Sequence, residues 1–528
     1  MNIWIVSREY AGIAEAGGVK NVACSLSESL VSLGHKVTLF IPLYACTDLS
    51  LVKNYSCLWH EPVKFKISQT VQSFAYSHGV MNGVDFVFIG HKKFSEKKGV
   101  YTYTREDELE NANHIHGHGH EDVNFLNTIF QKAVVCYGET CKKEDAPDII
   151  HCQDATAALV PTYMRYKMQI DLQAKSFFSK TKCFVTIHNA GPGYHHSFAN
   201  VDEAIYYTAL PASILSEGIC NRKVEPFLLA AKDSVLTTVS PEYANEILSG
   251  KVDTDGLSEV FRERNVKIYG ITNGIDYSRY DPADTKKSSL PFAFNPIQKN
   301  FEGKYKCREY LLNKYCYKQG LHSETISVEE NLTSFGHLNP SAEKCVYFVF
   351  HGRAVVQKGL DVLIDACKIV LEKNIPAKFI LFGQGDVKIE EKLSLLTKDF
   401  NGSVVYLRGY SKELSRLCIA SADFSLHPSY FEPCGLEDFI AQIYGTIPVA
   451  HATGGLCKIV NEKTGFLYKP NEANILSELI EKLCNDYLSN QEKYLNLASY
   501  ASLYVKENYN WKLITENKYL KLYKNEEV

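Results

Sequence analysis

Short apolar runs alternate with stretches of helical periodicity along most of the chain. In the first half, residues 3–7 and 36–42 are apolar, and between them Val22, Leu26 and Leu30 recur as on one face of a helix that ends near residue 34. This order predicts a strand–helix–strand unit with parallel strands. Further strands are expected at 148–154, 184–189, 235–241 and 269–276, with a helix from residue 155, and residues 52–88 are predicted to be β-rich.

The pattern weakens between residues 281 and 344, where Pro, Ser, Asn and Lys are frequent. We expect a boundary there, with one helix at 304–315 and an exposed insertion near 319–340. A clean alternation of strands and helices then returns. Strands are predicted at 346–350, 378–382, 404–407, 424–426 and 447–450, with helices between them, and the tail at 500–523 is predicted to be helical.

Two domains of the same class follow from this pattern. The fold class is expected to be α/β, with a doubly wound N-terminal domain over residues 1–270 and a second doubly wound domain over 271–499. The last segment, 500–528, is expected to cross back as a helix to the N-terminal domain. A chain of 528 residues is also too long for one core, which independently favours two large domains.

The composition is that of an ordinary globular protein, with 45% apolar and 22% charged residues. A net charge of −4 gives no reason to expect a nucleic-acid or membrane partner, and no apolar run approaches the ~18 residues of a membrane span. The sixteen cysteines are scattered without a C-x-x-C pair, which favours reduced, buried thiols over a disulfide framework. Because the chain starts with a strand pattern and no secretory signal, we expect a cytoplasmic protein, either a monomer or a small homo-oligomer.

Polar residues follow several predicted strands of the first half. Gly17 and Gly18 end the loop after the first strand, Asp154 ends a later strand, and His188 with Asn189 ends another. The carboxyl ends of parallel strands share one sheet edge, and glycine amides at a helix start there can hold a diphosphate. A tight turn would account equally well for the glycines, and a purely structural role would account equally well for a histidine at a strand end, so both alternatives stay open.

The segment from His114 to His120 contains four histidines in alternate positions. Imidazole is a common ligand of Zn and Ni, so this segment is a candidate metal site. The spacing is that of a loop, however, and neither a cysteine nor a carboxylate completes a ligand set. A surface loop is therefore favoured, and we expect neither a metal nor a cofactor.

The second half has its candidate chemistry at two turns. Glu432 lies in a proline-interrupted turn between a predicted strand and a helix, which is where open α/β sheets bind ligands. Arg353 and Lys358 flank the start of the domain's first helix, where cations oppose the helix dipole and an anion is expected. An arginine fork with a lysine suits a diphosphate leaving group. We interpret these turns as a site for an activated sugar.

The motif PSYFEPCGL, followed by YGTIPVAHATGGL, resembles the donor site of the bacterial-type glycogen and starch synthases. Agreement with this family extends over nearly the whole chain. Its members are glycosyltransferases of family 5, retaining enzymes with two Rossmann-like domains that face each other across a deep cleft, an arrangement called GT-B. The resemblance implies that fold for this chain.

The resemblance also implies roles for particular residues. Arg353 and Lys358 match the pair that binds the donor's phosphates, and Glu432 matches a carboxylate at the donor glucose. His188 matches the histidine that helps to stabilise the transition state, and Asp154 matches an aspartate near the sugar acceptor. The remaining positions that match the donor site are Gly17, Gly18, Asn273, Tyr410 (against the base), Cys434, Gly435, Leu436, Thr453, Gly454 and Gly455.

The implied activity is transfer of glucose from a nucleotide sugar, ADP-glucose by resemblance, to the non-reducing end of an α-1,4-glucan with retention of configuration. The chain departs from the family pattern at three places, four residues in all. Glu15 stands where a lysine is usual, Ala155 replaces an aromatic residue, and Glu437-Asp438 replaces Thr-Gln. Two alternatives stay open: a related transferase with another donor or acceptor, and a glucan-binding homologue with impaired catalysis.

Overall fold

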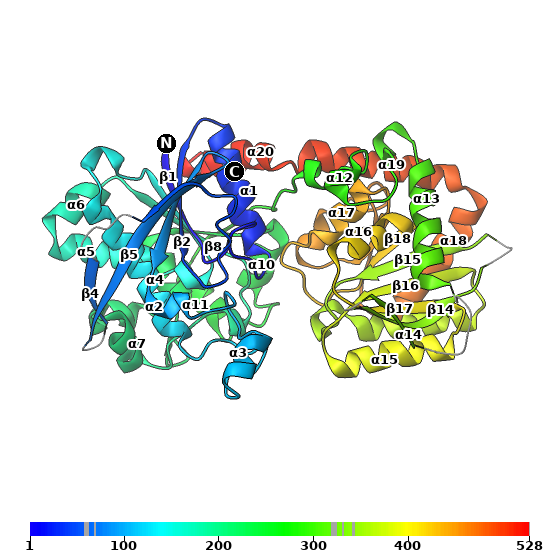
Figure 1. Cartoon of the computed structure of the whole chain (residues 1–528), viewed down its shortest axis with the longest axis horizontal. Helices are drawn as coiled ribbons and strands as arrows, with labels where there is room; N and C mark the ends of the chain where they lie inside the picture. The colour runs from blue at the N-terminus through cyan, green and yellow to red at the C-terminus, as the bar shows by residue number, and fades with distance from the viewer. Residues whose placement is uncertain (58–62, 68–69, 318–324, 330–331, 341–343, 527–528) are drawn as a thin grey trace. The chain divides into compact units, whose positions relative to one another are not determined.

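The computed structural model describes the chain except for residues 58–62, 68–69, 318–324, 330–331, 341–343 and 527–528. The chain forms two compact units, each built on its own sheet (Figure 1). Unit 1 consists of Met1–Asn273 together with Trp511–Val528, and unit 2 consists of Gly274–Asn510.

Unit 1 contains a ten-stranded sheet. Parallel neighbours run in the order β12-β11-β8-β7-β1-β2-β6, and β5 and β3 continue the sheet in antiparallel pairing. The expected β-rich stretch is confirmed by β3 to β6. The strands are β1 (Asn2–Val6), β2 (Lys36–Pro42), β3 (Lys53–Cys57), β4 (Val63–Ile67), β5 (Thr70–Met81), β6 (Val84–Gly90), β7 (Ile149–Gln153), β8 (Lys182–Ile187), β11 (Val235–Thr238) and β12 (Ile268–Gly270).

Helices connect the parallel strands of unit 1. The predicted first helix is confirmed as α1, where Val22, Leu26 and Leu30 are buried. The longer helices of the unit are α1 (Val19–Ser32), α4 (Val123–Tyr137), α5 (Val160–Ile170), α6 (Leu172–Phe178), α7 (Val201–Thr208), α9 (Pro226–Asp233), α10 (Pro241–Ser249) and α11 (Leu257–Glu263). The shorter helices are α2 (Lys92–Ser95), α3 (Arg105–Glu110), α8 (Ala212–Leu215), α20 (Trp511–Ile514) and α21 (Leu520–Tyr523).

Two expected elements of unit 1 are shorter than predicted. The strand expected at 269–276 ends at Gly270. The chain passes into unit 2 after Asn273, and Ile275 forms a β-bridge with Asn510 within that unit. The helix expected from residue 155 starts as a 3₁₀ turn, Ala155–Ala157, and the α-helix begins only at Val160. A proline in the first turn of α5 suits a helix start. N–H groups in the first turn have no intrahelical partner, so the N–H that proline lacks is not needed there.

Unit 2 contains an eight-stranded sheet in the order β13-β14-β17-β16-β15-β18-β19-β20. From β15 the chain adds β16 and β17 on one side, then returns to add β18, β19 and β20 on the other, which is the doubly wound order. The five strands expected after residue 345 are confirmed. The strands are β13 (Thr325–Glu329), β14 (Leu332–Leu338), β15 (Val346–His351), β16 (Ala377–Gly383), β17 (Ser403–Gly409), β18 (Phe424–His427), β19 (Ile447–His451) and β20 (Phe466–Tyr468).

The predicted exposed insertion at 319–340 is wrong over its second half. Strand β14 pairs antiparallel with β17 and buries Leu332 and Leu338 in the core of unit 2. The frequent polar residues between these two leucines conceal the strand pattern in the sequence. Residues 319–324 and 330–331 of the insertion lie outside the described part of the chain.

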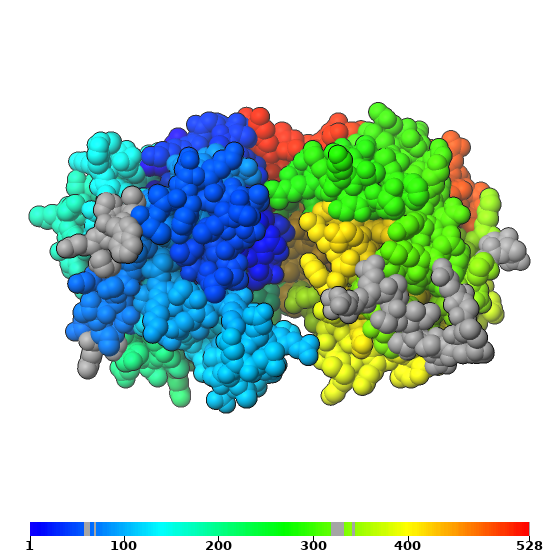
Figure 2. All heavy atoms as spheres, viewed as in Figure 1, coloured from blue at the N-terminus to red at the C-terminus, as the bar shows by residue number. Residues whose placement is uncertain are grey.

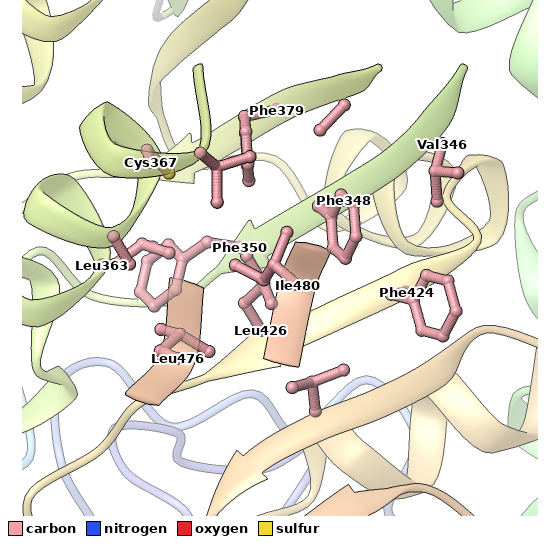
Figure 3. Close-up of a cluster of buried hydrophobic side chains, with 14 of the residues drawn as sticks. Val346, Phe348, Phe350, Leu363, Cys367, Phe379, Phe424, Leu426, Leu476 and Ile480 are labelled. Carbon is pink, nitrogen blue, oxygen red and sulfur yellow. The ribbon is translucent and has the colours of Figure 1, made fainter. Parts of the chain in front are cut away.

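The sheet of unit 2 is covered on both faces, because successive side chains of its strands alternate between two cores. Phe348, Phe350 and Phe379 point to the face covered by α14 and α18, where Leu476 and Ile480 meet them (Figure 3). Val349, Ile380 and Phe382 point to the opposite face, against α13, α16 and α17. Each such buried side chain contributes roughly 1.5–3 kcal/mol to the free energy of folding. These strands therefore form a stable support for the loops that follow their carboxyl ends.

The helices of unit 2 complete the two layers. Helix α13, predicted at 304–315, is confirmed with earlier bounds and is continued by a π-helical turn, Leu312–Cys316. The green segment that contains α12 and α13 lies at the surface in Figure 2. The helices are α12 (Thr285–Ser288), α13 (Glu302–Leu311), α14 (Leu360–Glu372), α15 (Val387–Asp399), α16 (Lys412–Ser421), α17 (Glu437–Ile443), α18 (Ala473–Ser489) and α19 (Gln491–Asn508). Among the described residues, no helix is long and apolar enough to cross a membrane.

Candidate active site

The glycine loop of unit 1 surrounds a carboxylate of the protein itself. The buried side chain of Glu9, just after β1, accepts hydrogen bonds from the N–H groups of Ala16 (3.0 Å) and Gly17 (2.7 Å). Tyr101 donates a third, at 3.3 Å. A Cβ on Gly17 would lie 3.2 Å from Glu9 Oε1, which explains the glycine. The anion that these two amides hold in this structure is therefore Glu9.

Glu9 is a site residue that the sequence prediction missed, although its signal is similar to that of Asp154: a carboxylate that follows a strand of the parallel sheet within three residues. Burial raises the pKa of the Glu9 carboxyl, against the hydrogen bonds from Gly17 and Ala16, which lower it. Glu15, the residue that replaces the usual lysine, forms an ion pair with Lys20 at 2.6 Å and accepts from the N–H of Gly12. Its charge is thus offset by a neighbouring ammonium.

Asp154 and His188 lie together at the carboxyl ends of the adjacent strands β7 and β8. The N–H groups of Ala155 and His188 bond the Asp154 carboxylate and lower its pKa, but burial dominates and raises it to about 7. Oδ1 of Asp154 has no hydrogen-bond partner among the described residues. His188 Nε2 lies 2.8 Å from Gln153 Oε1, and burial lowers the pKa of His188 to about 3, so its ring is neutral at pH 7.

The histidine-rich segment from His114 to His120 is a loop between α3 and α4, as predicted. Its residues are mostly exposed, but His120 is buried, and burial lowers the pKa of that ring to about 4. Tyr103 stacks on His114 with ring centroids 4.2 Å apart. In the described part of the chain, no group of three or more His, Cys, Asp or Glu side chains has the arrangement of a metal site.

In unit 2 the predicted cation and carboxylate meet where the strand order reverses. Lys358 follows β15 and Glu432 follows the neighbouring strand β18, and Lys358 Nζ lies 2.6 Å from Glu432 Oε2. Ser429 Oγ donates to the same carboxylate oxygen at 3.3 Å. Arg353 lies on the same β15–α14 connection and is exposed to solvent. Doubly wound sheets bind ligands at this switch point.

Glu437, a position that departs from the family pattern, is also part of this cluster. Burial alone would raise the pKa of its carboxyl, but the nearby charges of Lys358 and His351, with the N–H of Leu436, lower it to about 2. Burial lowers the pKa of the Lys358 ammonium, but Glu432 and Glu437 raise it above its ordinary value. Lys358 is therefore charged at pH 7, paired with Glu432 and attracted by the nearby charge of Glu437. His427 is half-buried beside them, and the loss of solvent around its ring lowers its pKa to about 3.

The two motif turns of unit 2 are joined into one structure. The N–H of Gly455 donates to the carbonyl of Glu432 at 2.7 Å, and Thr453 Oγ1 donates to the carbonyl of Tyr430 at 3.3 Å. A Cβ on Gly455 would lie 2.1 Å from the carbonyl oxygen of Cys434, so only glycine permits this contact. The loop 432–436 and the turn 453–455 are thus brought together as predicted from their motifs.

Two further predicted site residues, Tyr410 and Asn273, belong to different units. Tyr410 directly follows β17, two strands from β15, and its ring is 78% exposed. Asn273 is the last residue of the main segment of unit 1; it is buried, and its Oδ1 finds no donor among the residues that the structure describes. Tyr410 is open enough for a flat ring to stack on it.

The arrangement of unit 2 is suited to binding an anionic group. A charged lysine at a sheet's carboxyl edge, with an exposed arginine on the same connection, can neutralise charge that develops on a departing diphosphate. A carboxylate within 2.6 Å of the lysine fixes the position of its ammonium. Unit 1 adds a neutral imidazole and two carboxyl groups of raised pKa at its own sheet edge.

Comparison with known proteins covers both halves of the chain. Residues 2–263 match the family model of the starch synthase catalytic domain, and residues 338–503 match that of glycosyl transferases group 1. The glycogen synthase of Thermodesulfovibrio yellowstonii is 28% identical over 99% of this chain and 97% of its own length. The glycogen synthase of Protochlamydia amoebophila is 27% identical over 99% of both chains.

Among solved structures, the catalytic domain of starch synthase IV from Arabidopsis thaliana, bound to ADP and acarbose, aligns with a TM-score of 0.78. It is 24% identical, and the alignment covers 99% of both chains, so the likeness establishes the two-domain GT-B fold. The motif resemblance thus extends over the chain in both sequence and fold. The chain belongs to the glycogen and starch synthase family of glycosyltransferases.

Proposed function

We propose that the protein is an α-glucan synthase. It transfers glucose from a nucleotide sugar, ADP-glucose, to the non-reducing end of an α-1,4-glucan and retains the configuration at the anomeric carbon. The observation that supports this most is the pairing of Lys358 with Glu432 at the point where the strand order of unit 2 reverses. The relatives named glycogen synthase support the same substrate class.

Lys358 and Arg353 act on the leaving group. When the bond between the glucosyl carbon and the diphosphate breaks, its electron pair leaves with the diphosphate, and negative charge grows on the phosphate oxygens. Lys358 is mostly shielded from water, so its attraction for that charge is stronger than that of an exposed lysine. Glu432 and Glu437 keep the ammonium in place before the donor binds.

The remaining roles follow the placement of the side chains. Glu432 holds the donor glucose beside its anomeric carbon. In unit 1, His188 acts as a neutral imidazole towards the sugar, because burial keeps its pKa far below 7. Asp154 accepts from hydroxyl groups of the glucan, for which its Oδ1 is available. The donor is bound by unit 2 and the acceptor by unit 1.

The donor assay tests this proposal directly. Purified protein is incubated with ADP-, UDP- or GDP-glucose and glycogen, and glucose incorporation into the polymer is measured. We expect incorporation from ADP-glucose at the highest kcat/KM. Incorporation from another donor only, or only without glycogen, would support the second candidate, a related transferase of different specificity. The Glu15–Lys20 pair in place of a lone lysine favours that candidate.

Variants of the cluster separate an active enzyme from a glucan-binding homologue with impaired catalysis. Lys358→Ala removes the leaving-group cation and leaves the half-buried carboxylates of Glu432 and Glu437 without its charge, so kcat/KM should fall by ~100-fold or more. Glu432→Ala should have an effect of similar size. Lys373→Ala is the matched control, because Lys373 forms an exposed ion pair with Glu481 in the same unit and should leave kcat/KM unchanged. No turnover by the wild type with any of the three donors would exclude the synthase.

A further inference from the structure

Lys458 is a buried cation that neither the motifs nor the proposed mechanism uses. It lies in the 3₁₀ turn Gly454–Lys458 after β19, with only 4% of its side chain exposed. Its ammonium forms an ion pair with Asp438 Oδ1 at 2.8 Å, and the Asp438 side chain is completely buried. The ammonium also lies 4.4 Å from the centre of the Phe439 ring.

Three backbone carbonyls converge on the same ammonium. Lys458 Nζ donates to the carbonyl oxygens of Cys434 (2.6 Å), Gly435 (3.0 Å) and Gly455 (3.1 Å). The first two belong to the loop after Glu432 and the third to the turn after β19. With Asp438 the ammonium has four acceptors for three protons, so no proton is left for a substrate. Lys458 therefore cannot be another phosphate ligand.

Because Lys458 binds these carbonyl groups, the N–H groups of the same peptide bonds also have a fixed direction. In a trans peptide the C=O and N–H groups point in opposite directions. When Lys458 binds the carbonyls of Cys434 and Gly435, the N–H groups of the next residues, Gly435 and Leu436, point away from it. The Leu436 N–H already donates to a carboxylate, that of Glu437, at 3.2 Å. The Leu436 N–H is thus taken by Glu437, and the Gly435 N–H is the amide on the same outward side that can meet a bound anion.

We propose that Lys458 is a positioning residue of the donor site. Its ammonium ties the loop 432–436 to the turn 453–458 and aims the amide of Gly435 at the bound donor, while Asp438 offsets its charge. This inference rests on the proposed function, because it takes the loop as the place where the nucleotide sugar binds. The Glu437-Asp438 departure from the family pattern then has a partner in the same structure, since Asp438 pairs with Lys458.

Removing the ammonium alone and removing the whole ion pair have different consequences. Lys458→Met leaves Asp438 buried without a counter-charge, whereas the double variant Asp438→Asn/Lys458→Met removes both charges and should fold well. Both variants lose the ammonium that binds the carbonyls. We expect both to raise the KM for ADP-glucose at least tenfold and to leave the KM for glycogen unchanged, with the double variant regaining most of the lost melting temperature.

A matched control is Lys304→Met. Lys304 is another buried lysine of unit 2, whose ammonium donates to the carbonyls of Ala420 and Tyr444 and to Thr446 Oγ1. Its loss should lower the melting temperature without raising the KM for ADP-glucose. Hydrogen–deuterium exchange provides a readout that needs no turnover: peptides spanning residues 430–438 should lose protection in both Lys458 variants and keep it in Lys304→Met.

Two results would overturn the positioning role. One is a double variant that regains both the wild-type KM and the wild-type protection of residues 430–438, since the pair would then serve stability alone. The other is Lys458→Met with an unchanged KM and unchanged exchange. If the wild type transfers no glucose from any sugar nucleotide, the proposed function fails, and the exchange experiment with binding of ADP still decides whether Lys458 orders the loop.

Discussion

Asp154 combines backbone strain with a carboxyl oxygen, Oδ1, that has no hydrogen-bond partner among the residues described by the structure. Its φ of 65° with a ψ of 178° is unusual for a residue with a side chain, and such conformations concentrate at functional sites. The strain turns the carboxylate back towards the N–H groups of Ala155 and His188, which hold it at the edge of the sheet. A carboxyl of pKa about 7 is partly protonated near neutral pH, so it can both accept and donate hydrogen bonds to sugar hydroxyls.

The raised pKa of Asp154 makes the stability of unit 1 depend on pH. The folded state binds this proton up to about pH 7, while the unfolded carboxyl releases it near pH 4, so the stabilisation is present below pH 4 and is lost as pH rises through 7. Asp154→Asn removes the titration. We expect the unfolding free energy of the wild type to fall relative to that of the variant between pH 4 and 7, by an amount on the order of 4 kcal/mol.

Urea unfolding at several pH values measures this difference. Asp148→Asn is the control, because Asp148 is exposed at the start of the same strand and should leave the pH profile parallel to that of the wild type. A parallel profile for Asp154→Asn as well would mean that Asp154 is ionised throughout this range.

Site residues that belong to a recognisable motif could be predicted from the sequence. Site residues whose role depends on contacts with distant parts of the chain could not. Lys358 and Glu432 are recognisable from their turns, and the structure brings them within 2.6 Å. Lys458 has no such signal, because its partners are carbonyl oxygens of a loop 23 and 24 residues earlier. Glu9 could have been found, since it follows a strand as Asp154 does, but the glycines after it indicate a ligand phosphate just as well.

Strands and helices could be predicted from the sequence wherever their apolar residues recur in a regular pattern. β2 was predicted with its bounds, and the alternation in β15 and β16 is visible because each strand feeds two apolar cores. β14 was missed because polar side chains dominate it, and its pairing with β17 fixes it in the sheet instead. The strand expected through residue 276 is shorter, since the chain passes from one unit to the other there.

The turn Gly454–Lys458 allows a prediction at the scale of a single structural element. A Cβ on Gly455 would meet the Cys434 carbonyl oxygen at 2.1 Å and its Cα at 2.3 Å, so Gly455→Ala must push the turn and the loop apart. A displacement of about 1 Å at a reacting centre can reduce the rate ~100-fold, and we expect kcat/KM for ADP-glucose to fall by about that factor. Gly119→Ala, where an added Cβ meets open space, should keep wild-type kinetics. Equal kinetics for the two variants would show that the turn is not part of the donor site.

At the scale of the whole molecule, the two ends of the chain fold together. The residues from Trp511 onward belong to unit 1, where the buried rings of Tyr519 and Tyr523 pack on His151 of β7. Tyr523 Oη lies 2.7 Å from His151 Nδ1, and Lys182 Nζ donates to the carbonyl oxygen of Tyr523. The last residues of the sequence therefore cover β7, a central strand of the unit 1 sheet.

Truncation after Asn510 should consequently destabilise unit 1 and spare unit 2. The loss of several buried aromatic side chains, at roughly 3–5 kcal/mol each, exceeds what a domain of ordinary stability tolerates. Calorimetry of the truncated chain should show the transition of unit 2 alone, and limited proteolysis should leave a fragment close to Gly274–Asn510. Tyr523→Phe removes only the hydroxyl that bonds His151, so it should cost about 1 kcal/mol and keep both transitions. An unchanged unit 1 transition in the truncated chain would mean that the C-terminal helices cover a sheet that is already stable without them.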